Sequence, residues 1–215
     1  MDTAARKQVT RNLLKHAGTT YADEAGIRLK DQPMPLFQLL TLCMLASKPI
    51  DATIAMRAAR ELFIAGMRTP PAVLSAKRAD MISAFGRAHY VRYDESSATR
   101  LADIAAAVRD DYDTDLRELA TRSDHDVTAA ARLLKRFNGI GDTGADIFLR
   151  EVQDVWTWAR PYFDKRAVAA ARELGLSADP DELGALVPRD NAKLAAALVR
   201  VSLDDELRDK VTSQQ

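Results

Sequence analysis

Two glycines flank one aliphatic residue in the segment Asn138-Gly139-Ile140-Gly141. Glycine adopts a positive φ without strain and allows another backbone, or a phosphate, to approach closely. Apolar residues at helical spacing lie on both sides of the segment, so it predicts a tight connection between two helices with Ile140 in the gap between them. An ordinary turn between two helices, closed by a glycine cap, is the alternative.

The start of the second helix is a candidate anion-binding site. The first N–H groups of a helix have no acceptor within the helix, and the helix dipole favours negative charge beside them. Lys135 and Arg136 add positive charge just before the turn. We therefore expect phosphate contacts from seven residues, which are Gly139, Ile140, Gly141, Thr143, Gly144, Lys135 and Arg136.

Two acidic residues in the same helix start oppose this expectation. Asp142 and Asp146 place negative charge where a phosphate would approach, which weakens binding unless their side chains point away. Asp142 has a second interpretation, as a residue that caps the helix.

Asp164 is the other candidate for chemistry, in Pro161-Tyr162-Phe163-Asp164-Lys165. It stands between aromatic residues and the start of a predicted helix. A carboxylate in this position can accept a proton or stabilise positive charge on a substrate. It can equally cap the helix, which aspartate does well. Both roles stay open, because one residue can fill both.

The elements that must position these residues are predicted to be helices. Alanine is abundant, aromatic residues are 6% of the chain, and β-branched runs are short. Leu101, Ile104, Ala105 and Val108 form an apolar stripe at helical spacing. The run 36–46 is apolar nearly all round, which indicates a helix buried at the centre of a bundle. The predicted fold class is all-α.

Charge is balanced overall and uneven along the chain. Lys plus Arg and Asp plus Glu each number 31, which counts mildly against a nucleic-acid partner. Residues 1–30 carry six basic and three acidic side chains, whereas residues 173–215 carry five basic and nine acidic ones. A local basic face is therefore compatible with the neutral total, and a local face is what phosphate contact requires.

Cysteine usage excludes several classes of site. Cys43 is the one cysteine, so the chain can form neither an internal disulfide nor a four-cysteine iron–sulfur site. Cys43 lies in an apolar run and is expected to be an inert core residue. The N-terminus is polar, not a signal peptide, and the run 36–46 is too short to span a bilayer. We expect a cytoplasmic protein with no membrane and no metal site.

The segment from Phe137 to Ala145 resembles the helix-hairpin-helix of the endonuclease III-like DNA glycosylase superfamily, which reads apolar-Pro-Gly-apolar-Gly-x-x-x-Ala. In that superfamily a catalytic aspartate follows about twenty residues later at the start of a helix, and Asp164 lies 21 positions after Thr143. The segment Leu39–Asp51 is similar to the one that places a base-filling wedge residue. The likeness covers about residues 35–175.

The resemblance implies an architecture of two helical lobes with a DNA-facing cleft. Residues 35–150 would form the central lobe, with the helix-hairpin-helix at about 127–153. Residues 1–34 and 155–215 would form the second lobe, which carries Asp164. The partner implied is double-stranded DNA, damaged or mismatched. A monovalent cation at the hairpin carbonyls is conceivable, and no other cofactor is expected.

The chain also departs from the superfamily pattern. Thr143 occupies the place of the lysine that gives bifunctional members their lyase activity, and Asn138 replaces the usual proline. Lys48 stands where many relatives have a glutamine, and is the candidate wedge. Without an amine at position 143 no Schiff base is expected there, although Lys48 or Lys165 could substitute. The expected activity is hydrolysis of an N-glycosidic bond without strand cleavage.

Trp156, Trp158 and Tyr162 lie between the predicted hairpin helix and Asp164. A glycosylase holds the flipped base between aromatic or apolar side chains, so these three residues are the candidate base pocket. Two tryptophans in a helical bundle can equally pack in the core.

Three functions follow from the sequence. The first is a monofunctional DNA glycosylase of base-excision repair, with Asp164 catalytic. The second is a DNA-binding or damage-sensing member of the same fold that has lost catalysis. The third is an unrelated helical interaction protein.

Overall fold

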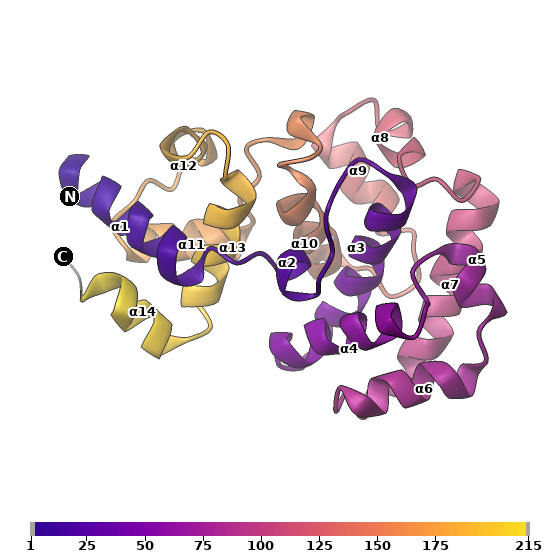
Figure 1. The fold of residues 1–215 in the computed structure, drawn as a ribbon. Coiled ribbons are helices and arrows are strands. Elements are labelled where there is room, and N and C mark those ends of the chain that lie inside the picture. Colours follow the sequence, from indigo (N-terminus) through magenta and orange to yellow (C-terminus); the bar gives the residue numbers. More distant parts are fainter. Residues whose placement is uncertain (1–2, 214–215) are drawn as a thin grey trace. The chain divides into compact units, whose positions relative to one another are not determined.

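The computed structural model describes residues 3–213, and every regular element in that range is helical (Figure 1). The all-α prediction is confirmed. No helix among residues 3–213 combines the length and the apolar character needed to cross a membrane.

The chain divides into two compact units, and one of them is discontinuous in sequence. The first unit runs up to Tyr21 and resumes at Leu149, whereas the second is Ala22–Phe148. The sequence placed the first boundary at 34/35, where prolines interrupt the chain. Pro33 instead occupies the first turn of a helix inside the second unit, because a proline ring suits a position whose N–H has no acceptor.

The second unit is built around one buried helix, α3 (Pro33–Ala46). Every residue of α3 from Pro35 to Leu45 is buried, as its all-round apolar sequence predicts. The helices α4 and α7 pack against α3 (Figure 1). The elements in this part of the chain are α2 (Tyr21–Glu24), α3, α4 (Ala52–Ile64), α5 (Pro70–Ser75), α6 (Arg78–Arg87), α7 (Asp94–Tyr112), α8 (Glu118–Arg122), α9 (Val127–Leu134) and the start of α10 (Asp142–Val152).

Local sequence signals set the ends of these helices. Asp51 caps α4 by accepting hydrogen bonds from the N–H groups of Thr53 and Ile54. Asp126 caps α9 in the same way, through the N–H of Ala129. The predicted stripe on α7, from Leu101 to Val108, is buried against the core.

The first unit joins the N-terminal helix to the C-terminal part of the chain. The helix α13 (Asn191–Val201) packs against both α1 (Thr3–Ala17) and α11 (Lys165–Glu173). The core contains Val9 and Leu13 from α1 together with Leu194 and Leu198 from α13. The side-chain amide of Asn12 also donates to the carbonyl of Val211 at 3.0 Å. The remaining elements are η1 (Thr157–Ala159), α12 (Pro180–Leu186) and α14 (Asp205–Thr212).

Candidate functional site

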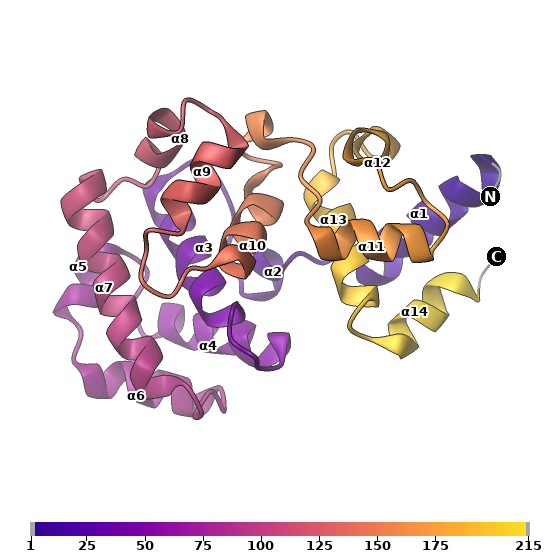
Figure 2. The ribbon, with the colours of Figure 1, turned by 180° about the vertical axis from the view of Figure 1, so that it is seen from behind.

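The connection between α9 and α10 runs from Lys135 to Gly141 as a looped segment that contains consecutive turns (Figure 2). The N–H of Phe137 donates to the carbonyl of Leu134, and the N–H of Ile140 donates to that of Phe137. Gly139 has a φ of +90°, which an L side chain rarely adopts. A Cβ on Gly139 would also lie 2.7 Å from Cδ of Arg100, so both the backbone and the packing require glycine there.

Ile140 fills the gap beside α10. Its side chain is 4% exposed, and a Cβ built on Gly144 would lie 3.2 Å from its Cγ2 atom. The carbonyl oxygen of Cys43 on α3 lies 3.6 Å from the same Cβ position, so α3 also packs against Gly144. Because the N–H of Ile140 is already bonded to Phe137, Ile140 acts here as a packing residue and offers no free donor.

Backbone N–H groups at the start of α10 remain available. The N–H groups of Gly141 and Thr143 donate none of the backbone hydrogen bonds that lie outside the helices of residues 3–213, whereas Gly144 is buried. Gly141 and Thr143 are exposed, and no atom lies within 4 Å of a Cβ built on Gly141. The start of α10 therefore presents donors and the positive end of a helix dipole to open space.

Charged side chains near the turn partly neutralise one another. The ammonium of Lys135 lies 2.8 Å from the carboxylate of Asp142, and both side chains are exposed. Arg136 is exposed. Burial raises the pKa of the Tyr112 phenol, and the charges of Arg122 and Arg136 offset part of that increase. Asp142 thus has a cationic neighbour, which reduces the repulsion that its charge would exert on an anion.

Ser47 and Lys48, which follow α3, lie at the other side of the hairpin. The hydroxyl of Ser47 lies 3.0 Å from the carbonyl of Met44 and 3.3 Å from the carbonyl of Gly139, so the two acceptors share its one proton. Lys48 is half-buried, and burial together with the charge of Arg100 lowers the pKa of its ammonium. The wedge role of Lys48 stays a prediction. A monovalent cation bound at the hairpin also stays a prediction. A carbonyl oxygen such as that of Gly139 has two lone pairs with which it can accept hydrogen bonds or bind a cation.

Asp164 belongs to the first unit and sits at the start of α11. Its Oδ1 accepts from the N–H of Ala167 at 2.9 Å, so it caps the helix. Its Oδ2 accepts from the guanidinium of Arg150 at 2.7 Å. Asp164 is 8% exposed and Arg150 is 2% exposed. Both oxygens of the candidate catalytic carboxylate are therefore engaged within the protein.

Arg150 lies in a cluster of buried polar groups. Its Nε is 3.7 Å from a carboxylate oxygen of Glu151, which is 2% exposed. Its guanidinium carbon lies 5.0 Å from the centre of the Tyr21 ring, within the range of a cation–π contact. Burial disfavours the charged guanidinium, but the two carboxylates outweigh burial and raise the pKa of Arg150. The guanidinium is therefore a permanent cation beside Asp164.

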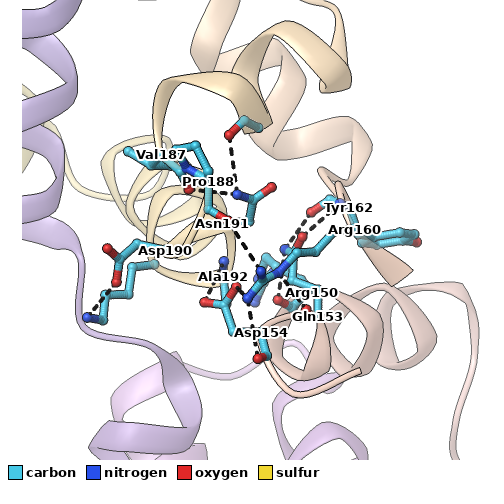
Figure 3. A network of polar contacts seen from close by, with 12 residues as sticks. Arg150, Gln153, Asp154, Arg160, Tyr162, Val187, Pro188, Asp190, Asn191 and Ala192 are labelled. Atoms are coloured by element: carbon cyan, nitrogen blue, oxygen red, sulfur yellow. Dashed lines mark hydrogen bonds and ion pairs between the residues drawn. The ribbon is translucent and has the colours of Figure 1, made fainter. Parts of the chain in front are cut away.

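A second network fixes the loop that leads to Asp164 (Figure 3). The side-chain amide of Gln153 donates to the carbonyl of Tyr162, and its oxygen accepts from the N–H of Tyr162. Arg160 donates to the carbonyls of Gln153 and Pro188 and to the carboxylate of Asp154. Burial raises the pKa of Asp154, against the opposite effect of Arg160. These contacts hold the segment before α11 in a defined conformation.

The aromatic candidates lie in this same part of the chain. The rings of Trp156 and Trp158 stack with centres 5.3 Å apart. Trp156 is 3% exposed, so it packs in the core, which was the alternative to a base pocket in the sequence analysis. Trp158 and Tyr162 are half-buried. A base pocket that uses Trp158 and Tyr162 stays a prediction.

Sequence reasoning missed Arg150 and Arg100. Arg150 follows Phe148 and Leu149 and precedes Val152, so a charged residue on a core-facing stretch of helix was the available signal. Arg100 directly precedes the apolar stripe of α7 and gives no comparable signal. The packing of its stem on Gly139 is visible only in the structure.

Comparisons with known proteins find distant similarity to solved structures. No protein-family model matches this chain, and no curated protein is similar to it in sequence. A solved structure described as a trapped endonuclease III–DNA covalent intermediate, an estranged-adenine complex, aligns with a TM-score of 0.49 and 15% sequence identity. The alignment covers 94% of this chain and 86% of the other.

Proposed function

We propose that this chain binds duplex DNA, with the start of α10 contacting the sugar–phosphate backbone. The observation that carries the proposal is the pair of N–H groups at Gly141 and Thr143, two exposed residues whose N–H groups donate none of the backbone hydrogen bonds outside the helices and which lie close in sequence to Lys135 and Arg136. Phosphate oxygens are suitable acceptors for such donors, and contacts of this kind position a protein on DNA without reading its sequence. The sequence resemblance of this hairpin points to the same partner.

A substitution that adds charge without harming the helix tests the hairpin contact. Thr143 is exposed in the first turn of α10, where a glutamate is favourable for the helix and repels a phosphate. We expect Thr143→Glu to keep its thermal stability and to bind a duplex with an abasic-site analogue about tenfold more weakly, roughly 1.4 kcal/mol. Fluorescence anisotropy at 0.1 M salt measures this affinity.

Thr128→Glu is the matched control. Thr128 is also exposed and also the second residue of its helix, but it lies at the end of α9 away from the hairpin. This variant has the same net charge as Thr143→Glu. Equal affinities of the two variants would show that the hairpin does not contact the backbone. Absence of any salt-dependent duplex binding would leave the chain as a helical interaction protein.

Base release is the second candidate function, with Asp164 as the carboxylate. The placement of Asp164 at the start of α11 favours it, because a buried carboxylate at a helix start is held rigidly. The ion pair with Arg150 counts against it, since a carboxylate that shares its charge with a guanidinium stabilises positive charge on a sugar less well. The geometry therefore favours the DNA-binding function without base release.

A panel of lesion-containing duplexes decides between the two functions. We expect DNA binding without release of any base from the panel. Release that is lost in Asp164→Asn would establish the glycosylase function and the catalytic role of Asp164. Release that survives in this variant would place catalysis elsewhere. A covalent adduct trapped by borohydride would indicate an amine, and Lys48 and Lys165 are the residues to vary.

A further inference from the structure

Two cations lie together beside the hairpin without a carboxylate between them. Lys48 follows α3, and Arg100 is on α7. Burial lowers the pKa of the Lys48 ammonium, and the charge of Arg100 lowers it further. Both side chains are half-buried. Among residues 3–213, neither side chain forms a hydrogen bond or ion pair with an acidic group.

Packing at the hairpin fixes where Arg100 lies. The position of a Cβ on Gly139 is 2.7 Å from Cδ and 3.5 Å from Cγ of Arg100, so the aliphatic stem covers this glycine. The guanidinium begins one bond beyond Cδ and therefore lies at the edge of the hairpin. Lys48 follows Ser47, whose hydroxyl lies 3.3 Å from the carbonyl of Gly139 and 3.0 Å from that of Met44, so the backbone at Lys48 is next to the same glycine.

Two acidic residues near the hairpin have other partners. Asp103, one turn after Arg100 on α7, accepts from the side-chain amide of Asn138 at 2.7 Å. Asp142 pairs with Lys135 at 2.8 Å. The fold thus holds two like charges together at a free-energy cost and leaves them without compensation, an arrangement that is common at binding sites for anions.

We propose that Lys48 and Arg100 form a phosphate-binding site beside the hairpin, which in the complex with DNA holds one phosphodiester of the strand. The part that concerns DNA rests on the proposed function. The planar guanidinium of Arg100 matches two phosphate oxygens, and the ammonium of Lys48 adds a point charge. A bound phosphate supplies the negative charge that the pair lacks. This role differs from that of a wedge, which inserts into the base stack and needs no charge.

Two substitutions, one at Lys48 and one at Arg100, each remove one positive charge with little change in the shape of the side chain. Lys48→Gln keeps the side chain that a wedge requires and removes the ammonium. Arg100→Met keeps an aliphatic stem over Gly139 and removes the guanidinium. Lys77→Met is the control, because Lys77 is an exposed lysine at the start of α6 without a side-chain hydrogen bond. We expect Lys48→Gln to be at least as thermally stable as the unmodified protein, since it relieves burial and repulsion.

The first measurement is duplex affinity as a function of salt. Each phosphate contact contributes about 0.9 to the slope of log K against log salt concentration for duplex DNA. We expect Lys48→Gln and Arg100→Met each to lower this slope by about 0.9 and to weaken binding about threefold to tenfold at 0.1 M salt. Lys77→Met should retain the slope. Unchanged slopes in both site variants would refute the site while the hairpin contact, tested by Thr143→Glu, could still stand.

The second measurement uses inorganic phosphate and needs no DNA. Phosphate is expected to raise the melting temperature of the unmodified protein and of Lys77→Met more than that of Lys48→Gln or Arg100→Met. If the unmodified protein binds no duplex but shows this difference, the site stands and the proposed function fails. If the four proteins respond equally to phosphate and no slope changes, the site is refuted.

Discussion

The guanidinium of Arg150 and the carboxylate of Asp164 form an ion pair of 2.7 Å in which both side chains are buried. Arg150 is the ninth residue of α10, and Asp164 is the cap of α11, so the pair ties two helices of the chain together. A buried pair contributes little net stability compared with apolar residues of the same size, but the loss of one partner leaves the other charge buried and alone. Asp164 therefore has a structural role whether or not it has a chemical one.

Asp164→Asn is expected to destabilise the protein by about 3 kcal/mol, because Arg150 loses its closest counter-charge while the helix cap is retained. Urea denaturation at neutral pH measures this change. The control is Asp179→Asn at the cap of α12, where the carboxylate accepts from the N–H of Asp181 and is exposed. We expect less than about 0.5 kcal/mol there. Equal effects of the two substitutions would contradict a stabilising role of the Arg150 pair.

Gly139→Ala is expected to cost about 2 kcal/mol, since Gly139 has a φ of +90° and Arg100 occupies the space of a methyl group. Gly141→Ala is the matched substitution, because no atom lies within 4 Å of its Cβ position. We expect Gly141→Ala to change the free energy of unfolding by less than about 0.5 kcal/mol. Chemical denaturation of both variants measures the two changes in the free energy of unfolding. Similar changes would show that neither the positive φ of Gly139 nor its packing against Arg100 requires a glycine there.

Asp142→Asn is expected to tighten duplex binding about threefold at low salt, because it removes a negative charge at the start of α10 and releases Lys135 from its ion pair. The gain should shrink as salt increases. Loss of the exposed pair should cost at most about 1 kcal/mol of stability. Titrations at two salt concentrations check the prediction. A variant that binds more weakly would indicate that Asp142 organises the hairpin and does not repel DNA.

The carboxyl of Asp154 provides a pH-dependent prediction. Burial raises its pKa in the folded protein above the ordinary value. Its contribution to stability is therefore fully present below the ordinary pKa and is lost as the pH rises through the folded value. The stability of the unmodified protein relative to Asp154→Asn should fall as the pH rises above the ordinary aspartate pKa of about 3.9. A relative stability that rises over this range would show that the ion pair with Arg160 outweighs burial.

Much of the fold was predictable because its signals are local. The buried central helix follows from the apolar run 36–46, the cap of α4 from Asp51, and the tight turn from Gly139 and Ile140. These features depend on residues within a few positions of one another, so spacing alone identifies them.

The partners of the candidate site residues were not predictable in the same way. Asp164 and Arg150 are 14 residues apart, and the Asn138–Asp103 pair joins positions 35 residues apart. Such contacts depend on how helices pack, which the spacing of residues does not specify. The same reason explains why Arg100, the neighbour of Gly139 and Lys48, gave no signal in the sequence.

The discontinuity of the first unit has a consequence for synthesis on the ribosome. The helix α1 is synthesised before the second unit, whereas α13 and α14, which pack against α1, follow that unit in the chain. The whole of the second unit, Ala22–Phe148, is complete before those helices exist. Since domains generally fold as units during translation, the partners of α1 are still missing while the second unit is synthesised, and the apolar face of α1 is uncovered during that time.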